Sequence, residues 1–205
     1  MIDCTKNQTV TLWKVTPKDS PELLEIYKPY VTDTAISFEY NVPSQKEFME
    51  RVSNTVKNYP YIAARQGDTI VGYTCAGPFK ERAAYNWAVE TTIYIRPGFV
   101  HSGIGRRLYT ALEQCLRLQN IFNANACIAW QGDEDRYLTH NSVEFHSHMG
   151  YTMVGTFHKC GYKFHRWYDM VWMEKHLCSH PAIPDPVIPF EQLSPSLLKT
   201  YGINV

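Results

Sequence analysis

The chain has 205 residues, of which 44% are hydrophobic and 14% aromatic, so it is long and apolar enough to form one globular domain with a full core. Twenty basic and twenty acidic residues give a formal net charge of zero, which excludes a broad basic surface for nucleic acid or anionic lipid. No apolar run approaches the roughly 18 residues of a membrane helix, and the first residues lack the pattern of a signal peptide. We therefore expect a cytoplasmic protein without nucleic-acid or membrane partners.

Cysteines and histidines do not suggest a metal centre. Six cysteines are spread along the chain without a Cys-x-x-Cys pair, at Cys4, Cys75, Cys115, Cys127, Cys160 and Cys178. Several fall on apolar faces, so we expect reduced and mostly buried thiols. His146 and His148 are two residues apart and would diverge on a helix, so we expect no metal site.

The first part of the chain is predicted to form a strand and two helices. The strand covers residues 10–15, and Ser20 followed by Pro21 is typical of a helix start. This helix is expected to fray near Pro29, and an exposed aromatic loop (AISFEY, residues 35–40) follows it. Ser44 and Glu47 form a capping box before a second amphipathic helix that ends at residue 60.

Strands dominate the next part. Apolar alternation predicts strands over residues 61–65, 69–76 and 85–95, with a tight turn at residues 66–68. A helix follows the loop that contains Gly103 and Gly105. Then come a buried strand over 126–130, an acidic loop, a short helix over 141–149, and two strands over 151–157 and 167–174.

The last segment differs in composition from the rest. Residues 178–205 contain five prolines, so we expect neither a regular helix nor a central strand there. Four apolar side chains nevertheless argue against a free tail, namely Ile183, Val187, Ile188 and Phe190. We therefore divide the chain into a domain over residues 1–177 and an extension over 178–205 that packs on this domain or on a partner subunit.

The most informative motif joins the strand that ends at Ile95 to the following helix. Gly103 and Gly105 lie in the connecting loop, and Arg106 and Arg107 come next. Free backbone N–H groups at a helix start attract anions, and glycines let a phosphate approach closely, so we expect a phosphorylated ligand here. The loop lacks the Gly-Lys-Ser/Thr of a Walker motif and the third glycine of a dinucleotide site. A tight turn without a ligand is the alternative, and both arginines could equally be solvated.

Several separated blocks carry a family resemblance. Together with AISFEY these are residues 77–95 (GPFKERAAYNWAVETTIYI), 103–112 (GIGRRLYTAL), 142–151 (SVEFHSHMGY) and 161–169 (GYKFHRWYD). Over residues 10–176 the chain resembles the GCN5-related N-acetyltransferase (GNAT) superfamily, and within it the phosphinothricin acetyltransferases. This resemblance implies an α/β (α+β) fold whose mixed, mostly antiparallel sheet is flanked by helices and splayed between its fourth and fifth strands.

The same resemblance implies a reaction. Acetyl-CoA would donate its acetyl group, by direct attack, to the primary amine of a small molecule such as phosphinothricin or methionine sulfoximine, in a homodimer. Two alternatives stay open, an acetyltransferase of peptide or protein amines and a non-catalytic acyl-CoA-binding module.

The resemblance also implies the roles of individual residues, from their positions within the matching blocks. Glu90 would be the catalytic base, and its apolar strand predicts a raised pKa; a solvated surface carboxylate is the alternative. His146 would protonate the thiolate or help to deprotonate the amine, unless it is a core histidine satisfied by the backbone. The expected substrate contacts are Phe38, Lys80, Tyr85, Trp87 and Trp167.

The expected acetyl-CoA contacts surround the glycine loop. They are Ile93, Tyr94, Ile95, Val100, His101, Ser102, Gly103, Ile104, Gly105, Arg106 and Asn141. Val100 stands where the family usually has Gln or Arg. Thr139 stands where the family tends to have Asn, so Asn141, two residues further on, either contacts the coenzyme or only caps its helix with Glu144. Tyr109 is assigned to packing.

Overall fold

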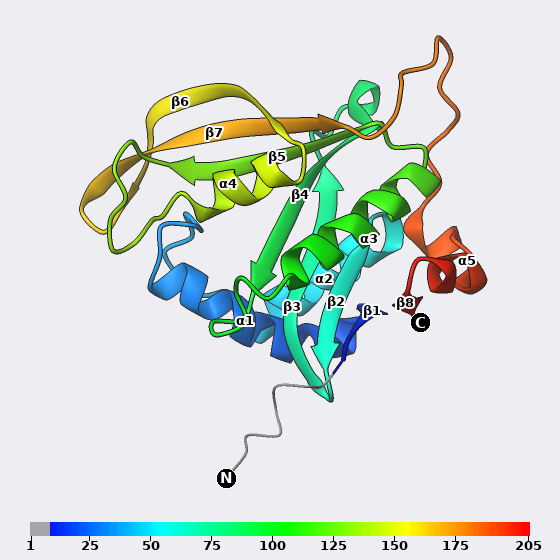
Figure 1. Ribbon diagram of the computed structural model, residues 1–205, viewed down its shortest axis with the longest axis horizontal. Coiled ribbons are helices and arrows are strands. Elements are labelled where there is room, and N and C mark those ends of the chain that lie inside the picture. Colours follow the sequence, from blue (N-terminus) through cyan, green and yellow to red (C-terminus); the bar gives the residue numbers. More distant parts are fainter. Residues whose placement is uncertain (1–8) are drawn as a thin grey trace.

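The computed structural model describes residues 9–205, which form one eight-stranded sheet with helices on its faces (Figure 1). The strands are β1 (Val10–Lys14), β2 (Tyr61–Gln66), β3 (Thr69–Pro78), β4 (Ala88–Ile95), β5 (Asn123–Trp130), β6 (Thr152–Lys163), β7 (Arg166–His176) and β8 (Ile203–Asn204). The α-helices are α1 (Ser20–Thr32), α2 (Gln45–Asn58), α3 (Ile104–Leu118), α4 (Asn141–His148) and α5 (Pro195–Thr200). Short 3-10 turns cover Pro17–Asp19, Ala83–Tyr85 and Phe190–Gln192.

The sheet has the order β6-β7-β5-β4-β3-β2-β1-β8. Its neighbours are antiparallel except for β4 with β5 and β1 with β8, which are parallel. This mixed, mostly antiparallel sheet confirms the fold class expected from the sequence. Helix α3 lies on one face of β2–β4, and α1 and α2 lie on the other (Figure 1).

Three buried clusters fill the layers. One contains the apolar stripe of α3, with Leu108 packed near the β2 side chain Ile62. A second joins α1 and α2 to the opposite face of the same strands, around Leu23 and Tyr73. The third joins α3 to β5 and β7 through Leu112 and Val171. Burial of these apolar side chains supplies the main driving force for the layered arrangement.

The predicted helix signals are largely confirmed, with one exception at α1. Ser44 Oγ accepts from Glu47 N at 3.3 Å and Glu47 Oε2 accepts from Ser44 N at 2.7 Å, so the capping box closes as expected. The fraying expected near Pro29 was wrong, because α1 continues to Thr32. The buried side chain of Val31 lies in this last turn, so core packing outweighs the lost proline N–H.

Strand boundaries differ where turns intervene. β4 begins at Ala88, three residues later than expected, because Ala83–Tyr85 forms a 3-10 turn. β6 continues past Phe157 to Lys163 through a register shift between Phe157 and Gly161. Such bulges are not visible in apolar alternation.

The expectation of mostly buried thiols was wrong for the described residues. Cys115 is buried and Cys75 is half-buried, but Cys127, Cys160 and Cys178 are exposed; Cys4 lies outside the described residues. Cys127 and its cross-strand partner Trp172 lie on the face of β5 and β7 that points away from the buried cluster below α3. The Cys127 side chain is exposed for this reason. Among residues 9–205, no helix is both long and apolar enough to cross a bilayer.

The extension packs against the body of the domain. Phe190, Leu193, Leu198 and Ile203 are buried in the same cluster as Leu12 of β1, and β8 pairs with β1 at the sheet edge. The expectation of no regular helix was wrong, because α5 forms with Pro195 at its start, where a missing N–H costs nothing, and Ser194 caps it. Ile183, by contrast, is 88% exposed.

Phe190→Ala tests the contribution of the extension to the core. We expect a loss of about 3–5 kcal/mol in the free energy of unfolding, because a fully buried aromatic ring leaves a cavity. Urea denaturation measures the loss. Ile183→Ala is the matched control and should change stability by less than about 0.5 kcal/mol. Equal effects of the two substitutions would show that the extension does not share the core.

Candidate active site

The site lies where β4 and β5 part. Their parallel pairing covers only Ala88–Glu90 against Asn123–Asn125, and beyond it the two strands diverge (Figure 1). A cavity of about 130 Å³ opens in the gap, lined by Glu90, Thr91–Tyr94, Tyr109 and His146 among others. The splay expected between the fourth and fifth strands is therefore confirmed.

A larger cavity of about 640 Å³ adjoins this cleft at the N-terminus of α3. The two cavities share Ile36, Ile93 and Ser142, so they lie next to each other. Together they extend from the start of α3 to the gap between the strands, as a long ligand with a charged end and a reacting end would require.

The start of α3 has the geometry of an anion site. Gly103 precedes the helix in the left-handed region, at φ +80°, which glycine adopts without strain. The first helical turn closes with Arg107 N donating to Gly103 O at 3.2 Å. The N–H groups of residues 104–106 therefore precede the first intrahelical hydrogen bond and point out of the helix start. The positive end of the helix dipole adds to this field.

Eight of the eleven predicted coenzyme contacts line the 640 Å³ cavity, namely Ile93, Ile95, Val100, His101, Gly103, Gly105, Arg106 and Asn141. The side chains of the other three lie elsewhere. Tyr94 packs against Tyr27 at 4.9 Å between ring centroids, Ser102 Oγ donates to Phe99 O at 2.5 Å, and Ile104 lies in the core. Thr139 and Asn141 both line the cavity, and the N-cap of α4 is His140, so the alternative that Asn141 only caps the helix was wrong.

Glycine at position 105 is required by packing. A Cβ there would lie 3.1 Å from the ring of Phe145 on α4 and 3.6 Å from Ile93 Cδ1. The missing side chain thus lets α3 approach α4 closely while the backbone of Gly105 stays on the cavity surface.

Tyr30 is a cavity residue that sequence reasoning missed. Its hydroxyl donates to Ile95 O at 2.5 Å and accepts from Ile95 N at 3.3 Å. The backbone groups of Ile95 on the open edge of β4 are therefore satisfied by a side chain from α1. An extended ligand that paired with this edge would have to replace the Tyr30 hydroxyl.

Glu90 lies at the inner end of the cleft and is half-buried. Burial raises the pKa of its carboxyl group, and the positive charge of Lys80 partly opposes this shift. A raised pKa is useful in a proton acceptor that must work near neutral pH. Its environment is thus the partly apolar one that the sequence predicted.

His146 is buried and belongs to a chain of hydrogen bonds. Nδ1 lies 2.7 Å from Ser142 O, and because a carbonyl only accepts, Nδ1 carries the proton. Nε2 is then the acceptor for the Tyr109 hydroxyl at 2.8 Å. Desolvation lowers the pKa of His146 to about 4, so the imidazole is neutral at pH 7.

Tyr109 links His146 to β4. Its hydroxyl also lies 3.2 Å from Thr91 Oγ1, which donates to Asn125 O at 3.1 Å. The ring is fully buried and packs edge-on against Phe145. The sequence assigned Tyr109, a residue of this helix, to packing. Apolar periodicity does not show that its hydroxyl reaches the cleft.

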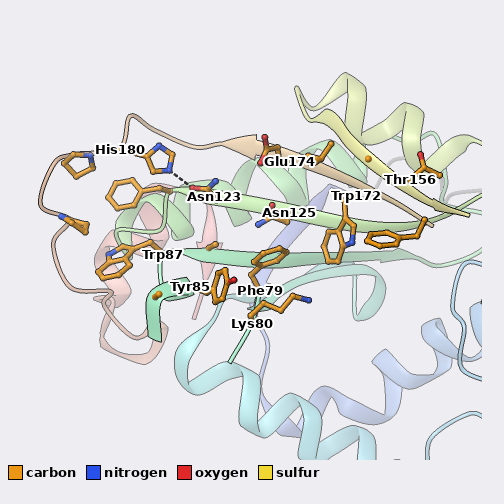
Figure 2. A pocket seen from close by; sticks show the side chains of 18 residues that line it. Phe79, Lys80, Tyr85, Trp87, Asn123, Asn125, Thr156, Trp172, Glu174 and His180 are labelled. Atoms are coloured by element: carbon orange, nitrogen blue, oxygen red, sulfur yellow. Dashed lines mark hydrogen bonds between the residues drawn. The ribbon is translucent and has the colours of Figure 1, made fainter. Parts of the chain in front are cut away.

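The five predicted substrate contacts lie in two places. Lys80, Tyr85 and Trp87 line a groove of about 860 Å³ over β4, β5 and β7, shown in Figure 2. Phe38 instead packs on the β6–β7 hairpin, with its ring 6.4 Å from that of Tyr168. Trp167 is exposed, with its ring 5.0 Å from that of Tyr162. Only three of the five therefore share one cavity.

The extension forms one wall of this groove. Trp87 Nε1 donates to Asp185 O at 2.8 Å, and His180, Pro181 and Pro184 lie beside it (Figure 2). Within residues 9–205 no group of three or more His, Cys, Asp or Glu side chains has the arrangement of a metal site.

Comparison with known proteins places this geometry in a family. The family model "Acetyltransferase (GNAT) domain" matches residues 12–172. The chain is 28% identical to the phosphinothricin N-acetyltransferase of Streptomyces viridochromogenes, over 92% of this chain and 98% of that protein. It is 30% identical to the enzyme of that name from Streptomyces coelicolor, over 78% of this chain and 92% of that protein.

A solved structure agrees with the sequence relatives. The phosphinothricin acetyltransferase from Sinorhizobium meliloti, in complex with acetyl-CoA, superposes with a TM-score of 0.79 at 29% identity, covering 89% of this chain and 97% of that one. The chain therefore belongs to the GNAT family of acetyltransferases. Within that family it is a member of the phosphinothricin N-acetyltransferase-like branch.

The buried imidazole makes stability depend on pH. Folded His146 stays neutral down to about pH 4, whereas in the unfolded chain it takes up a proton below its ordinary pKa of 6.5. The neutral imidazole therefore contributes fully to the free energy of unfolding above pH 6.5. As the pH falls to 4, this contribution of up to about 3 kcal/mol is lost. Urea denaturation at several pH values should show a shallower loss for His146→Gln than for the wild type. Parallel curves for the two proteins would contradict a buried, neutral His146.

Proposed function

We propose that the protein transfers the acetyl group of acetyl-CoA to the primary amine of a small amino-acid-like molecule, such as phosphinothricin or methionine sulfoximine. The observation that carries this proposal is the pair of adjoining cavities that extends from the start of α3 to Glu90 between the parted strands. The branch in which the chain falls supports the same reaction.

The residues present fit the coenzyme. The N–H groups of residues 104–106 and the side chain of Arg106 would hold the diphosphate, because both present donors and positive charge to one cavity. The edge of β4 around Ile93 would pair with the pantetheine arm in the manner of an added strand. The acetyl group then lies in the narrow cleft that Glu90, Tyr109 and His146 line.

Glu90 would be the general base. The acceptor amine is mostly protonated at pH 7, so a proton has to leave nitrogen before it attacks the thioester carbon. The carboxylate would accept this proton, directly or through water, and its raised pKa matches the task. As the bond from nitrogen to the acetyl carbon forms, the bond from that carbon to sulfur would break, and the leaving thiolate would take up a proton from water.

His146 would act as a neutral acceptor. Its pKa of about 4 leaves few imidazolium ions to donate a proton at pH 7. Nε2 instead fixes the direction of the Tyr109 O–H group at the cleft wall. Backbone N–H groups of residues 92–94 would stabilise the oxyanion that forms on the thioester oxygen.

Lys80, Tyr85 and Trp87 would bind the acceptor in the groove shown in Figure 2. The positive charge of Lys80 partly opposes the raised pKa of Glu90. The ammonium group of Lys80 would attract the acidic group of an amino-acid-like acceptor, while its amine lies towards Glu90.

We also propose a cytoplasmic homodimer. Val154 and Phe157 of β6 are exposed apolar side chains at the groove, and a second copy would cover them. Sedimentation equilibrium that returned the mass of one 23.7 kDa chain at micromolar concentration would contradict the dimer.

A panel of amines tests the reaction and separates it from the alternatives. Thiol release from acetyl-CoA should be fastest with phosphinothricin or a related amino acid, and slower with peptides, because Lys80 would favour a small acceptor that carries an acidic group. Preference for peptides would favour a protein acetyltransferase. Coenzyme binding without turnover on any amine would favour a binding module.

Glu90→Gln tests the assignment of the base. The variant should lose about 10²- to 10⁴-fold in kcat/KM at neutral pH, and the deficit should shrink as the pH rises and the free amine becomes abundant. Initial rates between pH 6 and 10 measure this. Glu81→Gln, an exposed neighbour of Lys80, is the control and should follow the wild type. A Glu90→Gln profile of unchanged shape would remove Glu90 from this role.

A further inference from the structure

Lys163 is a buried cation without a counter-ion. It lies at the end of β6 next to the turn into β7 and is 4% exposed. Its Nζ donates to Val31 O at 2.7 Å, Thr34 O at 2.9 Å and Ser37 O at 2.6 Å. These bonds use all three N–H donors of the ammonium group. No carboxylate of residues 9–205 forms an ion pair with it.

The three acceptors belong to one segment. Val31 lies in the last turn of α1, and Thr34 and Ser37 lie in the loop that follows it, residues 33–40. Carbonyl groups at the end of a helix carry partial negative charge, so they stabilise a cation. Burying a lysine is costly in itself, and here the backbone of this loop offsets the cost.

Neighbouring residues of the hairpin hold the same loop. Gly161 lies under Phe38, and a Cβ at Gly161 would lie 2.3 Å from the Phe38 ring. The Tyr40 hydroxyl donates to Tyr162 O at 2.5 Å. Three consecutive hairpin residues, 161–163, therefore fix loop 33–40 at three points.

The hairpin turn contains two residues in an uncommon backbone conformation. Phe164 and His165 both adopt left-handed backbone conformations, at φ +50° and +60°, which are uncommon for residues other than glycine. The Phe164 ring stacks on Tyr137 with 4.0 Å between centroids, and Ala35 N donates to Tyr137 O at 2.9 Å. The turn and the loop are thus joined through a shared neighbour as well.

Loop 33–40 borders the reacting end of the proposed site. Ile36 lines both the 640 Å³ cavity and the narrow cleft that contains Glu90 and His146. The position of this loop therefore sets the width of the junction where the thioester and the acceptor would meet.

We propose that Lys163 is a positioning residue for acetyl transfer, because its ammonium group binds the backbone carbonyls of Val31, Thr34 and Ser37 and so holds the end of α1 and loop 33–40 against the cleft. This inference rests on the proposed function. Lys163 does not touch the reacting atoms; it fixes Ile36 at the junction of the two cavities, so that the thioester is held in place and water is kept from it.

Lys163→Met is the principal test, because methionine keeps much of the length and removes the charge and the donors. We expect kcat to fall about tenfold, because Ile36 no longer holds the thioester in place, while the KM of the acceptor amine changes less than about twofold, because the groove of Figure 2 is lined by no residue of loop 33–40. The fraction of acetyl-CoA hydrolysed without acetylated product should also rise. Lys159→Met, which alters an exposed side chain of the same strand, is the matched control and should match the wild type.

Gly161→Ala provides an independent variant, because its new Cβ displaces Phe38 without altering charge. It should also lower kcat, and it replaces Lys163→Met if that variant does not fold. An unchanged kcat, or a tenfold rise in the KM of the acceptor amine, would overturn the inference.

Hydrogen exchange separates this inference from the proposed function. Amides of residues 33–40 should exchange at least about tenfold faster in Lys163→Met than in Lys159→Met, because the loop loses the bonds from Lys163 to Thr34 O and Ser37 O. If the wild type acetylated no amine, the proposed function would fail, and the exchange rates would still decide whether Lys163 holds the loop. Equal exchange in the two variants would overturn it.

Discussion

The short pairing between β4 and β5 is the constraint on which the site depends. Only three residue pairs join the strands, ending at Glu90 and Asn125, and the sheet then opens in its middle rather than at its edge. Backbone groups exposed by such a break must find other partners. Asn125 Nδ2 donates to Val89 O at the point of separation, and the Tyr30 hydroxyl bonds both backbone groups of Ile95 further along. The gap is thus stabilised without closing, which leaves room for an extended ligand.

Helices α3 and α4 turn this gap into a chemical site. Helix α3 directs its N-terminal N–H groups to the outer cavity and the Tyr109 hydroxyl to the inner cleft, while α4 supplies His146. Burial then shifts Glu90 and His146 towards their neutral forms, raising the pKa of Glu90 and lowering that of His146. The two shifts have one cause and opposite consequences: Glu90 becomes a better proton acceptor near neutral pH, and His146 becomes a fixed hydrogen-bond acceptor. In this cleft Glu90 would therefore accept the proton, and His146 would orient the Tyr109 hydroxyl.

Much of this arrangement could be predicted from the sequence, because its signals are local. The capping box at Ser44, the glycine loop around Gly103 and the alternation in β4 each act within a few residues, and all three appear in the structure. The contacts that sequence reasoning missed join distant segments: Tyr30 reaches a carbonyl 65 residues away, and Lys163 reaches three that are at least 126 away. Apolar periodicity reports which side of an element is buried, but not which element covers it.

The most direct test of this account is a crystal structure of the protein with acetyl-CoA. We predict that the diphosphate lies within hydrogen-bonding distance of the N–H groups of residues 104–106, and that the pantetheine arm replaces the Tyr30 hydroxyl along the open edge of β4. The acetyl carbon should then lie in the cleft between Glu90 and His146. A coenzyme bound elsewhere on the surface, with the Tyr30–Ile95 hydrogen bonds intact and the cleft closed, would contradict the account.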